Sequence, residues 1–97
     1  MINLSKISIN GKELEAISAK TEHSVILLIK AEKGILGCGY FNVEAANKLG
    51  DALAIVTGVK TFDDMLKAKV VKVSDKAKAL GIEEGISGKE ALEILSR

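Results

Sequence analysis

Residues 24–38, SVILLIKAEKGILGC, contain two short apolar runs on either side of the turn signal Glu32-Lys33-Gly34. The first run, residues 24–31, is continuously apolar at its centre, which is typical of a strand buried on both faces of a sheet. The second run, from Ile35 to Cys38, is long enough for one more short strand. Two apolar runs joined by so short a turn predict an antiparallel pair.

The segment before this pair predicts a β-hairpin. Residues 2–9, INLSKISI, alternate in part, with Ile7 and Ile9 on one face. Asn10-Gly11 follows and is the strongest short-range hairpin signal, because both residue types accept a positive φ. Residues 12–20, KELEAISAK, then return as a second strand. The N-terminal half of the chain therefore predicts an antiparallel β-meander.

The C-terminal half changes to an alternation of helices and strands. Capping residues mark the helix starts at Asn42, Thr61, Ser74 and Ser87, and capping boxes pair Thr61 with Asp64 and Ser87 with Glu90. The predicted elements are a helix over 43–49 ended by Gly50, a strand over 53–57, a helix after Thr61, a strand over 69–73, a short helix closed by Leu80-Gly81, and a last helix that buries Ala91, Leu92 and Leu95.

These elements predict the α+β (mixed α/β) class. An N-terminal antiparallel β-meander continues into strand–helix alternation, and one mixed sheet is packed by helices. A chain of 97 residues suits a single domain, 1–97. The sequence contains no internal repeat and no proline.

Composition narrows the possible partners. Hydrophobic residues make up 47% of the chain and aromatic residues only 3%, and the mean hydropathy is +0.23. So much aliphatic surface on so small a domain favours a homo-oligomer, most simply a dimer. The formal charge of +1 and the missing aromatic platform argue against nucleic-acid binding.

Neither a signal peptide nor a membrane-spanning run stands out, and the longest apolar run, residues 25–29, is far too short to cross a bilayer. One cysteine excludes an internal disulfide, so a reducing cytoplasm fits best. No Cys/His metal cluster is present, and the sequence indicates no particular cofactor.

Cys38 is the candidate catalytic residue. It ends a strand between Gly37 and Gly39, a few residues before the helix capped by Asn42, and this resembles a nucleophile presented on a sharp strand-to-helix turn. Tyr40 would be a hydrogen-bond partner and Lys60 a charge partner. The alternative is that Cys38 is a small apolar residue of the core. A nucleophile also needs a base, and counting outward from the Lys33 turn makes His23, the only imidazole, a rough cross-strand neighbour of Cys38. The alternative is that His23 is a solvated surface residue in the polar loop over residues 21–24.

Two loops could add an anion-binding function. Gly58-Val59-Lys60-Thr61 lies between a strand and a helix, although the glycine spacing of a phosphate-binding loop is missing. Gly85-Ile86-Ser87-Gly88-Lys89 has the same form, and either loop can instead be a plain turn before a capped helix. The candidate ligand-binding residues are Gly37, Gly39, Tyr40, Asn42, Lys60, Ser87 and Gly88, and a small anionic molecule is the expected ligand.

Three segments carry a family resemblance: Cys38-Gly39 at the end of an apolar strand, Gly58-Val59 after the next predicted strand, and the tail Leu80-Gly81-Ile82…Gly85…Ser87-Gly88…Ala91-Leu92. In their order and spacing they resemble the YunC-like family, small bacterial and archaeal domains of unknown function. The resemblance runs over nearly the whole chain. It implies a compact mixed α/β domain and no particular activity, and His23 matches nothing clear in it.

Two functions remain open at this level. One is a small cytoplasmic domain with a ligand-binding or thiol-based site around Cys38. The other is a non-catalytic homo-oligomeric or partner-binding module, whose glycines serve only tight turns and close packing.

Overall fold

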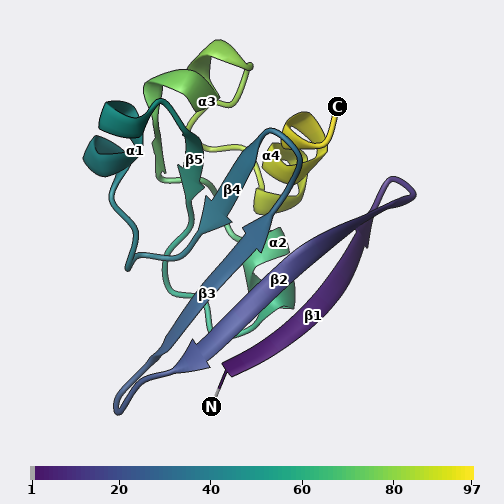
Figure 1. Ribbon diagram of the computed structural model, residues 1–97, viewed down its shortest axis with the longest axis vertical. Coiled ribbons are helices and arrows are strands. Elements are labelled where there is room, and N and C mark those ends of the chain that lie inside the picture. Colours follow the sequence, from purple (N-terminus) through teal and green to yellow (C-terminus); the bar gives the residue numbers. More distant parts are fainter. Residues whose placement is uncertain (1) are drawn as a thin grey trace.

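The computed structural model describes residues 2–97 and contains one six-stranded sheet with four helices (Figure 1). The strands lie in chain order across the sheet, which begins with β1 and ends with β6. The strands are β1 (Ile2–Ile9), β2 (Lys12–Lys20), β3 (Val25–Lys30), β4 (Gly34–Gly37), β5 (Ala52–Ile55) and β6 (Lys72–Val73). The helices are α1 (Val43–Leu49), α2 (Phe62–Lys67), α3 (Asp75–Ala79) and α4 (Gly88–Leu95).

The strand directions confirm the predicted fold class. Strands β1 to β4 form an antiparallel meander, β4 and β5 are parallel, and β6 is antiparallel to β5. The parallel pair needs a crossover, and α1 provides it. Asn10 (φ 52°) and Gly11 (φ 81°) form the two-residue turn between β1 and β2, as their sequence predicts.

Each predicted helix start is capped by the expected side chain. The side chains of Asn42, Thr61, Ser74 and Ser87 each accept a backbone N–H from the first turn of their helix. Ser74 does more than cap α3, because its buried Oγ also accepts the N–H of Leu53 at 2.9 Å and donates to the carbonyl of Asp51 at 2.9 Å. This hydroxyl therefore joins the start of α3 to the start of β5.

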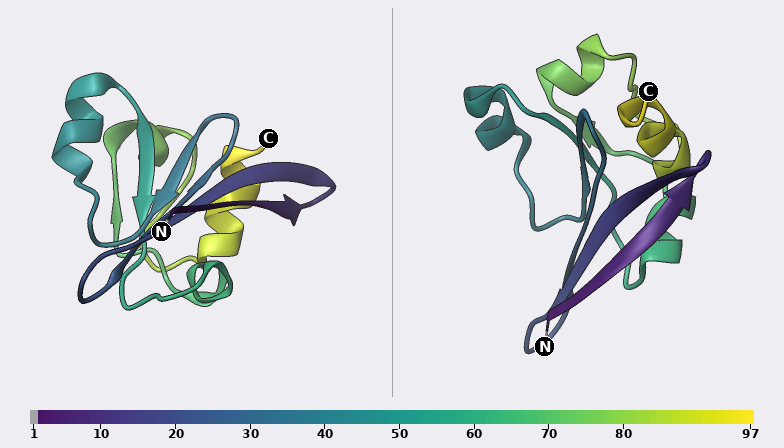
Figure 2. Two further views of the ribbon diagram at one scale, coloured as in Figure 1. Left: turned by 60° about the horizontal axis from the view of Figure 1, so that its bottom comes forward. Right: turned by 45° about the vertical axis from the view of Figure 1, so that its right-hand side comes forward.

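The main core lies on one face of the sheet, called here the inner face. Helices α2 and α4 pack on this face, and α4 buries Ala91, Leu92 and Leu95 as predicted. The opposite, outer face is covered by α1 only over β4 and β5, where Ala46 packs with Leu53 and Ile55. Figure 2 shows α1 and α4 on opposite sides of these two strands.

The expectation that residues 24–31 are buried on both faces is wrong in part. Leu27 and Ile29 face the core and are fully buried, whereas Ile26 and Leu28 on the outer face are only half-buried. The reason is the reach of α1, which covers β4 and β5 and contacts β3 little. The outer face of β1, β2 and β3 carries no helix.

The predicted strand over 69–73 is divided between two partners. Only Lys72–Val73 pairs with β5, while Lys69 forms an isolated bridge to Ser87. Val70 makes backbone hydrogen bonds to Ile86 and Gly85, so this part of the chain is held by the loop before α4. Strand β5 likewise ends at Ile55 rather than residue 57, although the N–H of Val56 still donates to Gly37.

Candidate functional site

Cys38 directly follows β4 and is held against Leu27 of β3. Its N–H donates to the carbonyl of Leu27 at 3.1 Å, and the N–H of Leu27 donates to the Cys38 Sγ atom at 3.3 Å. The residue is only 4% exposed and belongs to the main core. Cys38 is therefore both part of the β3–β4 pairing and a buried side chain.

A hollow of about 360 Å³ lies beside Cys38. Strands β4 and β5 are parallel, so their carboxyl ends meet at one edge of the sheet, and the loops that follow them enclose this space. Open α/β sheets bind ligands at such edges. The lining residues are Ser24, Val25, Cys38, Gly39, Tyr40, Thr57, Gly58, Val59 and Lys60. The structure thus brings together four of the predicted site residues: Cys38, Gly39, Tyr40 and Lys60.

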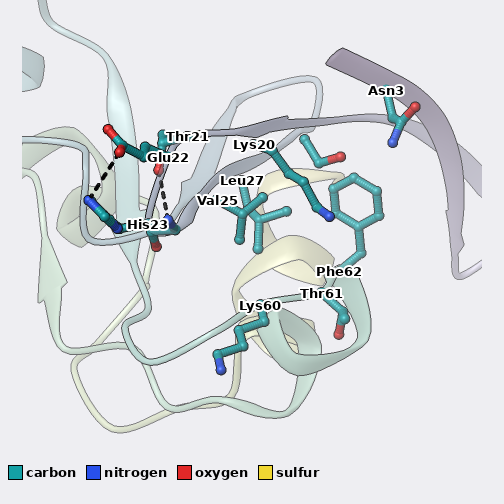
Figure 3. A pocket seen from close by; sticks show the side chains of 12 residues that line it. Asn3, Lys20, Thr21, Glu22, His23, Val25, Leu27, Lys60, Thr61 and Phe62 are labelled. Carbon is teal, nitrogen blue, oxygen red and sulfur yellow. Dashed lines mark hydrogen bonds and ion pairs between the residues drawn. The ribbon is translucent and has the colours of Figure 1, made fainter. Parts of the chain in front are cut away.

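A larger hollow of about 690 Å³ adjoins the first and shares Ser24, Val25 and Lys60 with it. It lies between the start of β1, the end of β2, the start of β3 and the start of α2, and Figure 3 shows its lining side chains. Lys20 of β2 and Phe62 of α2 both line this hollow. The two hollows together are called the groove below.

Sequence reasoning missed the larger hollow, although a signal for it exists. Asn3, Ser5 and Ser18 occupy inner-face positions of β1 and β2, where apolar core residues would be expected. Polar side chains at three such positions indicate that this end of the inner face is hydrated rather than packed. Asn3 and Ser18 do line the hollow.

Gly37, Asn42, Ser87 and Gly88 do not line the groove. A methyl group built on Gly37 would lie 2.6 Å from Cδ2 of the Phe41 ring, so this glycine makes room for an aromatic side chain. Asn42 caps α1 by accepting the N–H of Glu44. Ser87 caps α4, and Gly88 allows α4 to approach the carbonyl oxygen of Met65 too closely for any Cβ atom.

The glycine after Cys38 has no comparable steric role. Gly39 does not have a positive φ, and a Cβ atom there would lie 3.4 Å from Thr57, an ordinary contact distance. The two glycines beside Cys38 therefore differ: Gly37 is required by packing, whereas Gly39 leaves space at the wall of the groove.

Of the two interpretations of His23, the structure supports the surface residue and not a pair with Cys38. The residue opposite Cys38 is Leu27, four positions further along the chain than His23. His23 is 88% exposed, and its Nε2 atom lies 3.8 Å from Oε1 of Glu22. The smaller hollow is lined by Cys38 without His23, and the larger hollow by His23 without Cys38.

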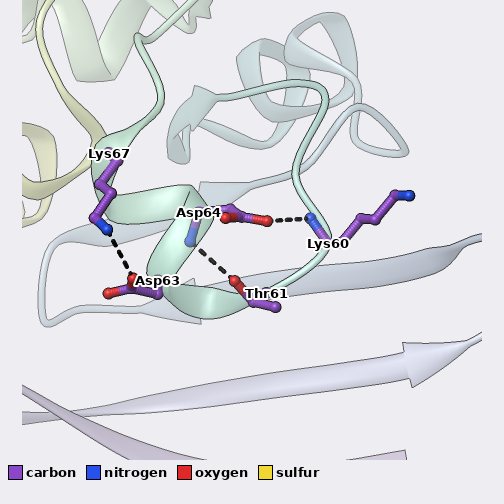
Figure 4. Close-up of polar contacts among 5 residues, drawn as sticks. All are labelled: Lys60, Thr61, Asp63, Asp64 and Lys67. Carbon is purple, nitrogen blue, oxygen red and sulfur yellow. Dashed lines mark hydrogen bonds and ion pairs between the residues drawn. The ribbon is translucent and has the colours of Figure 1, made fainter.

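In the loop before α2, a carboxylate of the protein itself accepts the backbone N–H that could otherwise bind an anion. Asp64 accepts the backbone N–H of Lys60 at 3.1 Å, while Thr61 accepts the N–H of Asp64 at 3.0 Å (Figure 4). Asp63 pairs with Lys67 at 3.1 Å. The Lys60 side chain extends away from α2, and its ammonium belongs to neither ion pair found among residues 2–97. An anion at this loop would therefore be bound by the Lys60 ammonium rather than by its backbone N–H.

The residues of the groove are better suited to binding a ligand than to covalent catalysis by Cys38. The residues that line the smaller hollow with Cys38 include neither an imidazole nor a carboxylate that could serve as a base. Within residues 2–97, no three His, Cys, Asp or Glu side chains are placed to hold a metal ion. What the groove presents instead is a set of hydroxyl groups with two lysines, Lys20 and Lys60.

No helix within residues 2–97 combines the length and the apolar character needed to span a membrane. A solved structure with the same fold is the crystal structure of a protein of unknown function, TA1206 from Thermoplasma acidophilum. It is 40% identical to this chain, the TM-score is 0.94, and the match covers 99% of this chain and 94% of that one.

The sequence comparisons confirm the family resemblance. The uncharacterized protein YunC of Bacillus subtilis (strain 168) is 33% identical over 96 residues, which is 95% of either chain. Residues 37–95, more than half of the chain, match the family described as Domain of unknown function (DUF1805). This stretch contains Cys38 and both candidate loops. The chain therefore belongs to the DUF1805 family, in which the relatives found are themselves uncharacterised.

Proposed function

We propose that this protein is a cytoplasmic single-domain protein that works as a homodimer and binds a small anionic ligand in the groove. The observation that carries the proposal is the meeting of the loops after β4 and β5 around Cys38, Tyr40 and Lys60. In open α/β sheets ligands bind outside the carboxyl ends of parallel strands, and β4 and β5 are the one parallel pair among the described strands.

The charges in the groove favour an anion. Among the lining residues the charged side chains are Lys20, Glu22 and Lys60, and Glu22 is close to His23. Two lysines therefore lie in the groove with one carboxylate, Glu22, whose side chain is 87% exposed. The hydroxyl groups of Ser24 and Thr57 line the smaller hollow next to Lys60 and can donate to a phosphate or carboxylate oxygen.

Cys38 contributes a wall to this site. Its sulfur is held by the N–H of Leu27, and the residue is almost fully buried. A ligand in the smaller hollow would contact the edge of the Cys38 side chain and occupy the space beside Gly39. The proposal assigns it no covalent step, because neither an imidazole nor a carboxylate is among the residues that line the hollow.

Titration with inorganic phosphate, followed by amide chemical shifts, tests the proposal. We expect shifts confined to residues 38–40 and 57–60, at concentrations up to roughly 10 mM. Lys60→Gln should weaken binding several-fold. Lys76→Gln is the matched control, because α3 follows the antiparallel β6 and starts at the opposite end of β5. No shift in the groove, or equal weakening by both variants, would overturn the anion site.

The alternative function, an interaction module without a ligand, is favoured by a different observation. On the outer face of β1, β2 and β3, two rows of aliphatic side chains are covered by no helix: Leu4, Ile17 and Leu28, and Ile2, Ala19 and Ile26. A partner bound to this face would not exclude a ligand from the groove, because the outer face and the groove lie on different parts of the molecule.

A further inference from the structure

Aromatic side chains are rare in this chain, and most of them lie in the groove. The sequence holds one tyrosine, Tyr40, two phenylalanines, Phe41 and Phe62, and no tryptophan. Among residues 2–97 the largest fully buried side chains are aliphatic, apart from Met65 and Ser74, so the core is built without a fully buried ring. Tyr40 lines the smaller hollow and Phe62 the larger one.

Phe62 belongs to the apolar floor of the larger hollow. It is the first residue of α2 and is half-buried. Phe62 and Val25 both pack against the main core, Leu27 belongs to that core, and all three line the hollow. Figure 3 shows the Phe62 ring pointing from the start of α2 into this space. One side of the ring is therefore supported by the core, and the other is available to a ligand.

Polar groups border this apolar floor. Asn3 and Ser18 pair across β1 and β2 and both line the hollow. They occupy inner-face positions, which carry the buried residues Ile9 and Leu14 at the other end of the hairpin. An amide and a hydroxyl can hydrogen-bond to the nitrogen or oxygen atoms of a heterocycle. An apolar floor with a few polar groups, in a hollow of about 690 Å³, is the usual composition of a small-molecule site.

The anion site adjoins this space directly. Ser24, Val25 and Lys60 line both hollows, and Lys20 adds a second ammonium to the larger one. Lys60 also precedes Phe62 by only two positions at the start of α2. One molecule can therefore place an anionic group beside Lys60 and a ring against Phe62.

We propose that the ligand of the groove is a phosphate monoester that carries an aromatic or heteroaromatic ring. The phosphate lies beside Lys60 and the hydroxyl groups of Ser24 and Thr57, and the ring stacks on Phe62. The inference deepens the proposed anion site and rests on it. An anion without a ring would leave Phe62 and Val25 in contact with water, whereas a ring covers both.

A sugar phosphate is the competing ligand class. The hydroxyl and amide groups at the border of the larger hollow suit its hydroxyl groups. Over the apolar floor, however, sugar hydroxyls would lose water without gaining a hydrogen-bond partner. The floor of Val25, Leu27 and Phe62 therefore favours a planar apolar ring.

The test compares two phosphate monoesters that differ in the ring. Phenyl phosphate and methyl phosphate carry the same anionic group, and amide chemical shifts followed during titration give both dissociation constants. We expect phenyl phosphate to bind at least about tenfold more tightly, because stacking on an aromatic side chain has an effect of this size. Its shifts should extend from residues 57–60 to residues 18–25 and Phe62.

Two phenylalanine variants test the contact itself. Phe62→Leu removes the ring at the groove but keeps an apolar side chain, so the preference for phenyl phosphate should fall to about threefold or less. Phe41→Leu is the matched control, because Phe41 lines neither hollow. This variant should keep the full preference. Circular dichroism checks that both variants are folded.

The outcomes separate the ring site from the anion site. If methyl phosphate binds in the groove and phenyl phosphate binds no more tightly, the anion site stands and the ring site is overturned. If neither compound shifts the groove residues, both proposals are overturned. The ring site is also overturned if Phe62→Leu keeps the preference, if Phe41→Leu loses it equally, or if ribose 5-phosphate binds more tightly than phenyl phosphate.

Discussion

The Sγ atom of Cys38 accepts a hydrogen bond from the backbone N–H of Leu27 at 3.3 Å, where an antiparallel ladder would otherwise place only backbone partners. The one cysteine of the chain is thus part of the β3–β4 pairing as well as the wall of the groove. Its structural contribution and any chemical role can be measured separately.

Replacing the sulfur tests the structural role. Cys38→Ala removes the acceptor for a buried N–H and leaves a small cavity, so we expect it to lower the free energy of unfolding by about 1–3 kcal/mol. Cys38→Ser keeps an acceptor atom and should cost less than Cys38→Ala. Urea denaturation measures both variants. If Cys38→Ser proves the more destabilising, the hydrogen bond contributes little and the apolar packing of the sulfur dominates.

Alkylation tests the chemical role. Because Cys38 is only 4% exposed, we expect iodoacetamide to label the native protein at least about a hundredfold more slowly than the unfolded protein. Labelling followed by mass spectrometry, with and without urea, gives both rates. Native labelling as fast as that of an exposed thiol would contradict this prediction and return a thiol-based site to consideration.

The sequence was most informative where structure is decided locally. The Asn10–Gly11 turn and the caps at Thr61 and Ser87 each depend on a few neighbouring residues, and all of them are found as predicted. The outer face of β3 could not be predicted in this way. Whether Leu28 is buried depends on which strands α1 reaches, and this is settled by the tertiary fold and not by the pattern of residues 24–31.

The candidate site was predictable only in part, for a related reason. Cys38, Tyr40 and Lys60 follow neighbouring parallel strands, so their convergence follows from the topology. The partner of Cys38 depends instead on the register of β3 with β4. That register pairs Lys30 with Ile35 and closes the turn by a hydrogen bond from Ala31 to Gly34. Glu32-Lys33 has no turn signature that fixes such a register, and a small shift would have changed the neighbour of the cysteine.

The two glycines beside Cys38 provide a matched pair of variants. Gly37→Ala brings a methyl group to 2.6 Å from the Phe41 ring, so we expect a loss of about 1–3 kcal/mol in unfolding free energy. Gly39→Ala meets only Thr57 at 3.4 Å and should change stability by less than about 0.5 kcal/mol. Thermal denaturation of both variants measures the difference. Equal losses would mean that Gly39 is also required by the backbone.

Gly39→Ala also bears on the ligand site. The added methyl group projects near Thr57 at the wall of the smaller hollow, so phosphate shifts at residues 38–40 and 57–60 should become weaker while the fold stays intact. Unchanged phosphate binding in this variant would place the anion elsewhere in the groove, nearer to Lys20.

Of the four helix caps, the Ser74 hydroxyl should contribute most to the free energy of unfolding. It accepts N–H groups from Ala77 at 3.3 Å and Leu53 at 2.9 Å and donates to Asp51, and it is buried. Ser74→Ala leaves a strand N–H and a helix N–H without this partner, so the expected loss in unfolding free energy is about 2–4 kcal/mol.

Thr61→Ala is the control, because Thr61 caps α2 at an exposed position and its replacement should cost about 1 kcal/mol. Urea denaturation compares the two variants, and hydrogen exchange at Leu53 should accelerate only in Ser74→Ala. If both variants lose the same stability and Leu53 stays protected, Ser74 acts as an ordinary cap and the junction of α3 with β5 depends on packing alone.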